Sequence, residues 1–171
     1  MTARGAGHTL DRAIPVQMER RMYHAFVRSR VRQLFAAASS GDAPAIMAAF
    51  APRFEHGFLG DHALGGLRTS HAATAEWYAR LYRLLPDISF EVTRIAVRGL
   101  PWATLVVADW TETNSGTDGV RTSNAGHHIV EIAWGRITRL TIVTDTAVLQ
   151  KTLDRLAAGG VAEAHAAPIT G

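Results

Sequence analysis

Apolar residues along the chain follow two different periods, and the change falls at Pro86. Before Pro86 they recur about every 3.6 residues, the helical period, and after it about every second residue, the period of strands. A helix is therefore predicted over 17–39. Its apolar face consists of Tyr23, Val27, Val31, Leu34, Phe35 and Ala38. A short second helix follows the cap residue Asp42, and a third follows a cap at Thr69 or Ser70.

The strand period predicts an antiparallel meander in the second half of the chain. Its strands are expected over 88–95, 104–113, 122–134 and 137–144, joined by tight turns. A shorter strand at 53–60 precedes the third helix, and a last helix begins at Asp145. This order predicts an α+β fold, a curved antiparallel sheet wrapped around three N-terminal helices with a short C-terminal helix. Successive antiparallel strands exclude a doubly wound nucleotide-binding fold.

The chain has 171 residues, 47% of them hydrophobic and 19% charged, which is typical of one globular domain. We expect a single domain over 18–157, a flexible N-terminal arm at 1–17 and a flexible C-terminal tail at 158–171. Because cysteine is absent, disulfides, thiol catalysis and cysteine-containing zinc sites are excluded. Neither a signal peptide nor a membrane-spanning run is recognisable, so we expect a cytoplasmic protein with no membrane partner.

The net charge of +3 is distributed unevenly along the chain. Residues 1–40 hold seven arginines against Asp11 and Glu19, a net of +5, whereas residues 41–171 hold eleven basic and thirteen acidic residues, a net of −2. No run of basic residues interleaved with aromatic residues occurs. The basic charge therefore belongs to the arm and the first helix, and a nucleic-acid partner is not expected.

Three short motifs follow one another in the second half of the chain. Leu85–Val92 (LPDISFEV) joins a proline–aspartate turn to an apolar strand, Gly135–Ile137 forms a hairpin turn, and Asp145 ends the last strand. Together they resemble the SnoaL-like polyketide cyclases of the NTF2-like superfamily over 31–156. The resemblance implies a cone-shaped pocket for a small molecule, a homodimer formed through the open face of the sheet, and an acid–base role for Asp145.

Two segments depart from the pattern of that family. Thr141 stands where relatives often have tryptophan, and Ser115–Asp118 replaces a Gly-Thr-His segment. The pocket chemistry can therefore differ from that of a polyketide cyclase. The superfamily also includes isomerases, dehydratases, epoxide hydrolases and binding domains, and the fold alone does not choose among them.

Asp145, His127 and His128 are the leading candidates for acid–base catalysis. If the strand face that carries Thr141 lines the cone, Asp145 points into an apolar cavity, where burial would raise its pKa. The same position is also an ideal helix N-cap. His127 and His128 are neighbours on a strand and point to opposite faces, so at most one of them enters the pocket. There it would hydrogen-bond an enolate oxygen or transfer a proton.

Other polar and aromatic residues are candidates for the pocket wall. Asp109 lies in an apolar run and is a further catalytic candidate, because a charge in such a run either faces solvent or is paired in a pocket. For the aromatic candidates, core packing or a dimer contact is the alternative. The candidates for substrate binding are His56, Trp77, Trp110, Glu131, Thr141 and Trp134. No spacing typical of metal ligands occurs, so no metal is expected.

Three functions fit these residues. The leading hypothesis is a cofactor-independent cyclase or isomerase of a small hydrophobic, oxygenated, polyketide-like metabolite. Asp145 would remove a proton α to a carbonyl, while a histidine or tryptophan N–H holds the enolate oxygen. The second is an epoxide hydrolase or dehydratase-type lyase, in which Asp109, Asp145 and Arg53 or Arg139 surround one water. The third is a non-catalytic ligand-binding or dimerisation module.

Overall fold

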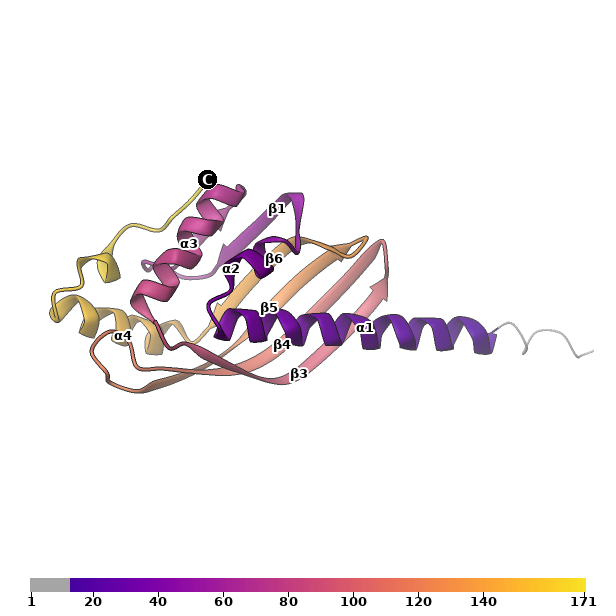
Figure 1. The fold of residues 1–171 in the computed structure, drawn as a ribbon, viewed down its shortest axis with the longest axis horizontal. Coiled ribbons are helices and arrows are strands. Elements are labelled where there is room, and N and C mark those ends of the chain that lie inside the picture. Colours follow the sequence, from indigo (N-terminus) through magenta and orange to yellow (C-terminus); the bar gives the residue numbers. More distant parts are fainter. Residues whose placement is uncertain (1–12) are drawn as a thin grey trace, which may run out of the picture.

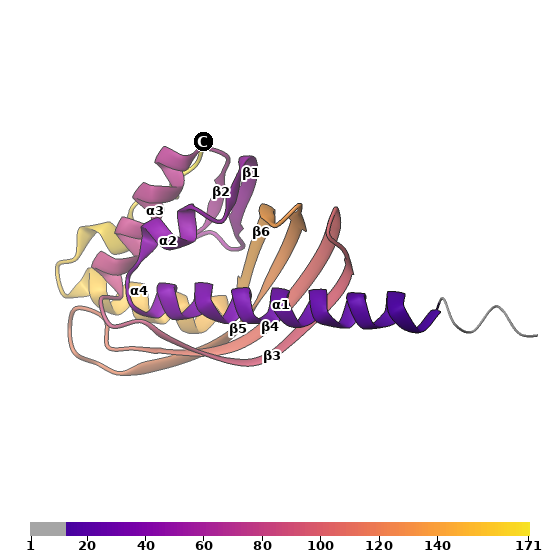
Figure 2. The ribbon, with the colours of Figure 1, turned by 45° about the vertical axis from the view of Figure 1, so that its right-hand side comes forward.

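The computed structural model describes residues 13–171, and side chains from Gln17 onward. The predicted N-terminal arm therefore lies mostly outside the described residues. The first helix, α1 (Ala13–Ser39), starts before the predicted residue 17 and ends where the sequence predicts. In Figures 1 and 2 its C-terminal half lies against the sheet, whereas its N-terminal half projects beyond the sheet edge.

The other helices begin at the residues whose side chains can cap them. The Asp42 carboxylate accepts the Ala45 N–H at the start of α2 (Ala43–Met47), and the Ser70 hydroxyl accepts the Ala73 N–H at the start of α3 (His71–Leu84). Asp145 caps α4 (Thr146–Ala158). A one-turn 3₁₀ helix, η1 (Ala162–His165), follows α4. Each N-cap satisfies backbone N–H groups that the helix itself leaves free.

The meander contains the predicted strands with slightly different ends. These strands are β3 (Ser89–Leu100), β4 (Ala103–Asn114), β5 (Thr122–Ala133) and β6 (Arg136–Thr144). The first strand, β1 (Phe50–Phe58), starts three residues earlier than predicted, because Phe50 pairs with Ile137 of β6 instead of continuing a helix. A short strand, β2 (Gly66–Arg68), which the sequence pattern does not predict, pairs with β1.

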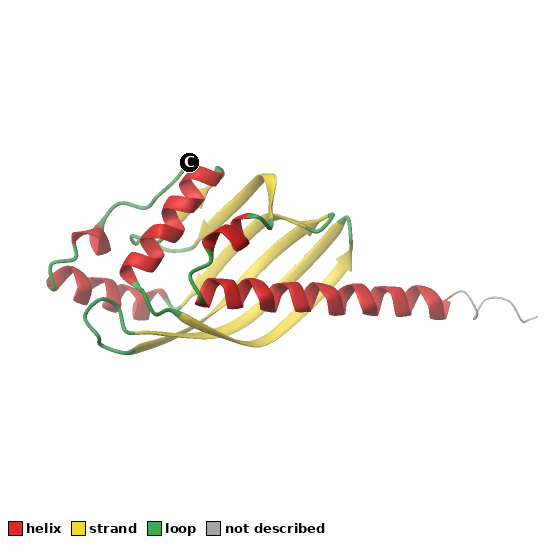
Figure 3. Ribbon diagram, in the orientation of Figure 1, coloured by secondary structure: helices red, strands yellow, loops and turns green. Residues whose placement is uncertain are grey.

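One six-stranded sheet contains all the strands, in the order β2-β1-β6-β5-β4-β3. The meander is antiparallel as predicted, whereas β1 runs parallel to β6. Figure 3 shows the sheet curving behind α1, α2 and α3, all of which lie on the same face of it. We call this concave face the inner face of the sheet and the opposite one the outer face. The α+β fold with its curved sheet is confirmed.

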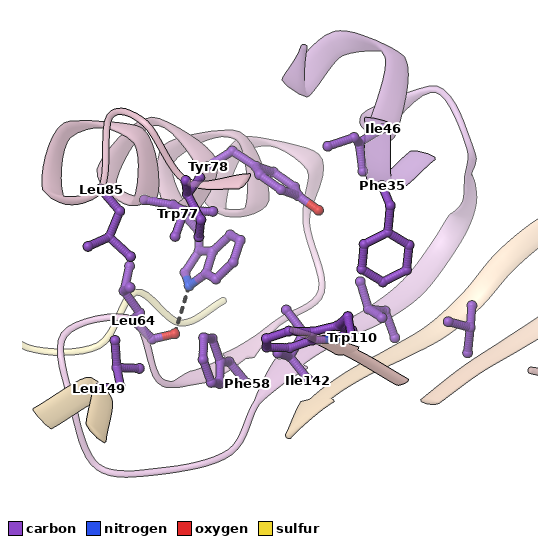
Figure 4. Packing of buried hydrophobic residues seen from close by; sticks show 14 of the residues in the cluster. Phe35, Ile46, Phe58, Leu64, Trp77, Tyr78, Leu85, Trp110, Ile142 and Leu149 are labelled. Atoms are coloured by element: carbon purple, nitrogen blue, oxygen red, sulfur yellow. Dashed lines mark hydrogen bonds between the residues drawn. The ribbon is translucent and has the colours of Figure 1, made fainter. Parts of the chain in front are cut away.

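Side chains alternate between the two faces along each strand. On β4 the even-numbered residues from Thr104 to Asn114 are buried on the inner face, and the odd-numbered residues are more accessible. The inner face packs with the helices into one apolar core. Figure 4 shows aromatic residues of this core, among them Phe35 from α1, Phe58 from β1, Trp77 from α3 and Trp110 from β4. The ring centroids of Phe58 and Trp77 are 6.1 Å apart.

The C-terminal segment packs against the domain, although we expected a flexible tail over 158–171. Ala164 and Ile169 are buried. The Ile169 carbonyl accepts a hydrogen bond from the Arg68 guanidinium, and the Gly171 carbonyl accepts the N–H groups of Thr69 and Ser70. These contacts come from residues about a hundred positions earlier in the chain, so local composition gave no indication of them.

Candidate functional site

Two adjacent chambers lie between the helices and the inner face of the sheet. The outer chamber, about 220 Å³, lies between α1 and strands β5 and β6, and its wall is mainly apolar, with Arg30 as its one charged residue among those described. The inner chamber, about 60 Å³, lies between α3 and the sheet. Four residues border both chambers and therefore form their junction: Phe35, Ala38, Tyr78 and His128.

A single carboxylate lines the two chambers among the residues that the structure describes, and it belongs to Glu112. Glu112 lies on the inner face of β4 with 6% of its surface exposed, and Asn124 is its cross-strand neighbour on β5. Burial raises the pKa of Glu112, while the Asn114 amide, which donates to both carboxylate oxygens at 3.1 and 3.3 Å, opposes the shift. Desolvation therefore favours the protonated form of this carboxyl group.

His128 projects from β5 into the junction of the chambers, and its ring is held by Trp110. The Trp110 indole N–H donates to His128 Nδ1 at 2.7 Å. Because that N–H can only donate, Nδ1 must be the acceptor, and the neutral ring carries its proton on Nε2. Burial lowers the pKa of His128 to about 3, so the ring is neutral at pH 7. Its Nε2–H bonds to none of the described residues and can donate to a ligand.

A glycine makes this hydrogen bond possible. Gly126 faces Trp110 across the β4–β5 pair. A Cβ atom on Gly126 would collide with the Trp110 ring and with the Val143 carbonyl oxygen. The indole therefore lies across β5 only because residue 126 has no side chain.

Tyr78 supplies a second donor at the junction. It is buried on α3, next to Trp77, and its hydroxyl has no hydrogen-bond partner among the described residues. In Figure 4 this hydroxyl points away from α3 toward the side of the cavity occupied by Phe35. Burial raises the pKa of the Tyr78 phenol, so it remains a neutral O–H donor at pH 7.

His56 and Trp77 are buried beside the chambers. The Arg68 Nε–H donates to His56 Nδ1 at 2.9 Å, and burial, followed by the charge of Arg68, lowers the pKa of His56 well below its usual value. His56 does not line either chamber. Trp77 lines the inner chamber with its ring, and its indole N–H donates to the Leu64 carbonyl at 2.7 Å (Figure 4). Trp77 therefore has a structural role in the core in addition to lining the inner chamber.

Four predicted residues lie on the outer face of the sheet. Asp109 accepts hydrogen bonds from Arg94 at 2.6 Å and from His127 at 2.8 Å, and these contacts lower its pKa. Glu131 is exposed and pairs with Arg139 at 3.5 Å. Thr141 has the side-chain direction opposite to that of Leu140 and Ile142, which are buried on the inner face.

Asp145 and Trp134 lie at the ends of strand β6, outside both chambers. The Asp145 carboxylate accepts the N–H groups of Ala147 and Val148 at 3.0 and 3.2 Å, so it acts as the N-cap of α4 and is exposed. Trp134 is 74% exposed in the turn between β5 and β6, where its φ is 52°. The inner face of β6 contributes Thr144 to the inner chamber instead.

Of the residues predicted from sequence, the structure brings His128, Trp110 and Trp77 to the cavity, and it adds Glu112 and Tyr78. A signal for Glu112 was present. If Trp110 points inward, Glu112, two residues later on the same strand, does so too, and Asp109 must point outward. Asp109 and Trp110 were both predicted to line the pocket, which this alternation excludes for neighbours on one strand.

Within residues 13–171, no group of three or more histidine, aspartate or glutamate side chains is arranged to hold a metal ion. None of the described helices is long and apolar enough to cross a membrane.

Several solved structures share this fold. TerC, co-crystallized with polyporic acid, has 19% sequence identity and a TM-score of 0.65, and the match covers 74% of this chain and 96% of that one. An NTF2-like protein of unknown function from Burkholderia pseudomallei has 17% identity and a TM-score of 0.66, with coverages of 73% and 95%. A putative SnoaL-like polyketide cyclase from a Jannaschia species has 16% identity and a TM-score of 0.60, with coverages of 72% and 88%. At these identities the likeness shows the fold.

Comparison with curated protein sequences finds no match. The family model of the SnoaL-like domain matches residues 31–140, which is most of the chain and contains every residue that lines the inner chamber except Ile142, Thr144 and Leu149. The protein therefore belongs to the SnoaL-like domain family, within the NTF2-like fold.

Proposed function

We propose that the protein is a cofactor-independent isomerase or cyclase, and that Glu112 is its general base. The observation that carries this proposal is a buried carboxylate with a raised pKa in the wall of a chamber whose other polar lining residues are uncharged. A carboxylate whose pKa is raised by desolvation is a stronger base than an exposed one. We assign the general-base role to Glu112 instead of the predicted Asp145. Asp145 lies outside the cavity, and its carboxylate accepts backbone N–H groups at the start of α4.

The junction residues complete the chemistry. Glu112 removes a proton from the carbon next to a substrate carbonyl, and the electron pair of that C–H bond moves to form an enolate. The enolate oxygen accepts hydrogen bonds from His128 Nε2–H and from the Tyr78 hydroxyl, two neutral donors already ordered before the substrate binds. Return of the proton to the γ carbon shifts a double bond. Alternatively, attack of the enolate carbon on a second carbonyl closes a ring, and the resulting alkoxide takes up the proton that Glu112 holds.

The chambers also limit the substrate. Their volumes are below the ~300–1,000 Å³ of pockets for drug-sized ligands, so we infer a small molecule with one polar end for the inner chamber and an apolar remainder for the outer one. The related TerC structure was obtained with polyporic acid. A hydrophobic, oxygenated substrate is consistent with that neighbour and with the apolar wall here.

The experiment uses enolisation itself as the readout. A panel of small β,γ-unsaturated ketones is incubated with the protein in D₂O, and exchange of the α-proton for deuterium is followed by NMR. We expect Glu112→Gln to slow exchange about a hundred-fold or more, the range of general-base catalysis. The matched control is Asp145→Asn, the same carboxylate-to-amide change outside the cavity, which should retain exchange.

The opposite pattern, with exchange lost in Asp145→Asn and kept in Glu112→Gln, would refute the assignment of the base. Binding of 2-naphthol, whose aromatic oxygen imitates an enolate, is measured on the same variants. If the wild type binds 2-naphthol in the cavity and catalyses no exchange with any ketone, the protein is a binding module instead. The hydrolase alternative is disfavoured because the described Asp109 and Asp145 lie on different surfaces, both outside the chambers.

A further inference from the structure

One end of the molecule exposes an unusual number of large apolar side chains. Met18, Met22 and Phe26 are 59%, 66% and 62% exposed and recur every fourth residue, so they form a stripe along the projecting half of α1. At the same end, Trp102 and Trp134 are 55% and 74% exposed, with ring centroids 6.1 Å apart. Tyr23 and His24 form hydrogen bonds with Thr104 and Gly99, which places this part of α1 beside the β3–β4 hairpin, and Figures 1 and 2 show the helix continuing past the sheet.

This surface borders the mouth of the outer chamber. Phe26 belongs to the exposed stripe and also lines that chamber. Gly135, next to Trp134 in the β5–β6 turn, lines it as well. The Trp134 N–H donates to the Pro101 carbonyl, which joins the two hairpin turns that carry the tryptophans. We call Met18, Met22, Phe26, Trp102 and Trp134 the apolar rim.

Positive charge accompanies the apolar rim. Between Met18 and Ser39, α1 has five arginines against one acid, Glu19, which is a net charge of +4. From the 100° rotation per residue, Arg21, Arg28 and Arg32 lie along one side of the apolar stripe. Among the described residues, none of the five arginines of this segment forms an ion pair with a carboxylate. The helix therefore presents an apolar stripe beside uncompensated cations.

This combination identifies the partner. A helix with a cationic side and an apolar stripe, accompanied by exposed tryptophans, is typical of proteins that lie on a lipid surface. A second copy of α1 would bring arginines against arginines. A nucleic acid would use the arginines but would leave the methionine, phenylalanine and tryptophan side chains in water. An anionic lipid surface satisfies both the charge and the apolar area.

We propose that the apolar rim and the arginines of α1 dock the protein on the surface of an anionic lipid bilayer, with the mouth of the outer chamber facing the lipid. The contact is peripheral. In this position a hydrophobic substrate can pass from the bilayer into the outer chamber without crossing water. The sequence predicts no membrane partner, because a peripheral contact of this kind needs no membrane-spanning segment.

The test is co-sedimentation of the full chain with vesicles of phosphatidylcholine alone, or mixed with an equal amount of phosphatidylglycerol. We expect binding to the anionic vesicles, weakened by salt. A surface arginine contributes about 1 kcal/mol, so the double variant Arg21→Gln/Arg32→Gln should bind about thirty-fold more weakly. Its matched control is Arg121→Gln/Lys151→Gln, which removes two exposed charges elsewhere and should bind like the wild type.

A second pair of variants tests the apolar contribution. Met22→Gln/Trp134→Asn should lower binding about ten-fold, and asparagine before Gly135 suits the turn that Trp134 occupies. The control Leu59→Gln/Val120→Asn changes exposed apolar residues outside the rim and should bind normally. Glu112→Gln should bind anionic vesicles like the wild type. The lipid-docking proposal can therefore be correct even if the proposed catalytic role is wrong, and the catalytic role can be correct even if lipid docking is wrong.

Several outcomes would overturn the proposal. The first is an absence of binding to anionic vesicles at low salt, and the second is equal binding to neutral ones. The third is a shift from dimer to monomer in Met22→Gln/Trp134→Asn by analytical ultracentrifugation, which would make the rim an interface between copies. The fourth is binding to duplex DNA that depends on Arg21 and Arg32 and not on Met22 or Trp134, together with no vesicle binding.

Discussion

Replacement of His128 by asparagine should remove a large part of the sensitivity of this protein to mild acid. In the folded protein burial lowers the pKa of His128 to about 3, whereas in the unfolded chain the imidazole has its ordinary value of about 6.5. Between these two pH values the unfolded state binds a proton that the folded state does not. Stability is therefore complete above the unfolded pKa and falls as the pH decreases.

The size of the effect follows from the two pKa values. Between pH 7 and pH 5, His128 should lower the free energy of unfolding by up to about 2 kcal/mol. Asparagine does not titrate, and its side-chain oxygen can accept the Trp110 indole N–H in place of His128 Nδ1. His56, whose pKa is also lowered by burial, is present in both proteins and cancels in the comparison.

The assay is urea unfolding of the wild type and of His128→Asn at pH 7, 6 and 5. The variant should lose about 2 kcal/mol less than the wild type over this interval. Leu153→Ala serves as the control, because it removes buried apolar volume from α4 and should lower stability by about 3 kcal/mol equally at each pH. Equal losses in the wild type and in His128→Asn would show that His128 is accessible to protons in the folded state.

Three further changes test other parts of the structure. Asp145→Ala removes the cap of α4 and should lower the free energy of unfolding by about 1 kcal/mol, with 2-naphthol binding unchanged; weaker binding would place Asp145 in the site after all. Gly126→Ala should cost about 1–3 kcal/mol and displace the Trp110 indole, which NMR of the indole N–H detects as loss of its hydrogen bond. Arg68→Met removes the donor to the Ile169 carbonyl, so limited proteolysis should cut after α4 faster than in the wild type, and an unchanged pattern would show that other contacts hold this segment.

The helices and meander strands could be predicted because their signals are local. Amphipathic periods, the caps Asp42, Ser70 and Asp145, and the stop at Pro86 act within a few residues of the elements they define. The errors occurred where distant segments meet. Phe50 is in a strand because β6 lies beside it, and Ile169 is buried because Arg68 reaches its carbonyl.

The site could be predicted only in part, because sequence periodicity says which residues share a face and not which face is covered. From the sequence it was already clear that His127 and His128 point in opposite directions. Once one side chain of the sheet is known to point toward the helices, the face of every other strand residue follows. A shift of one residue in register would move every side chain of a strand to the opposite face. Packing against α1 and α3 selected the face of Trp110, and with it Glu112 and His128.

The sequence by itself therefore determined the type and order of the main elements, the location of the basic charge in the first forty residues, and the family. The tertiary structure decided which carboxylate is buried, which histidine tautomer is held, and that the exposed apolar rim lies beside a cavity mouth. The physical reason is that periods and caps depend on neighbours in the chain, whereas burial and hydrogen-bond partners depend on residues brought together from separate elements.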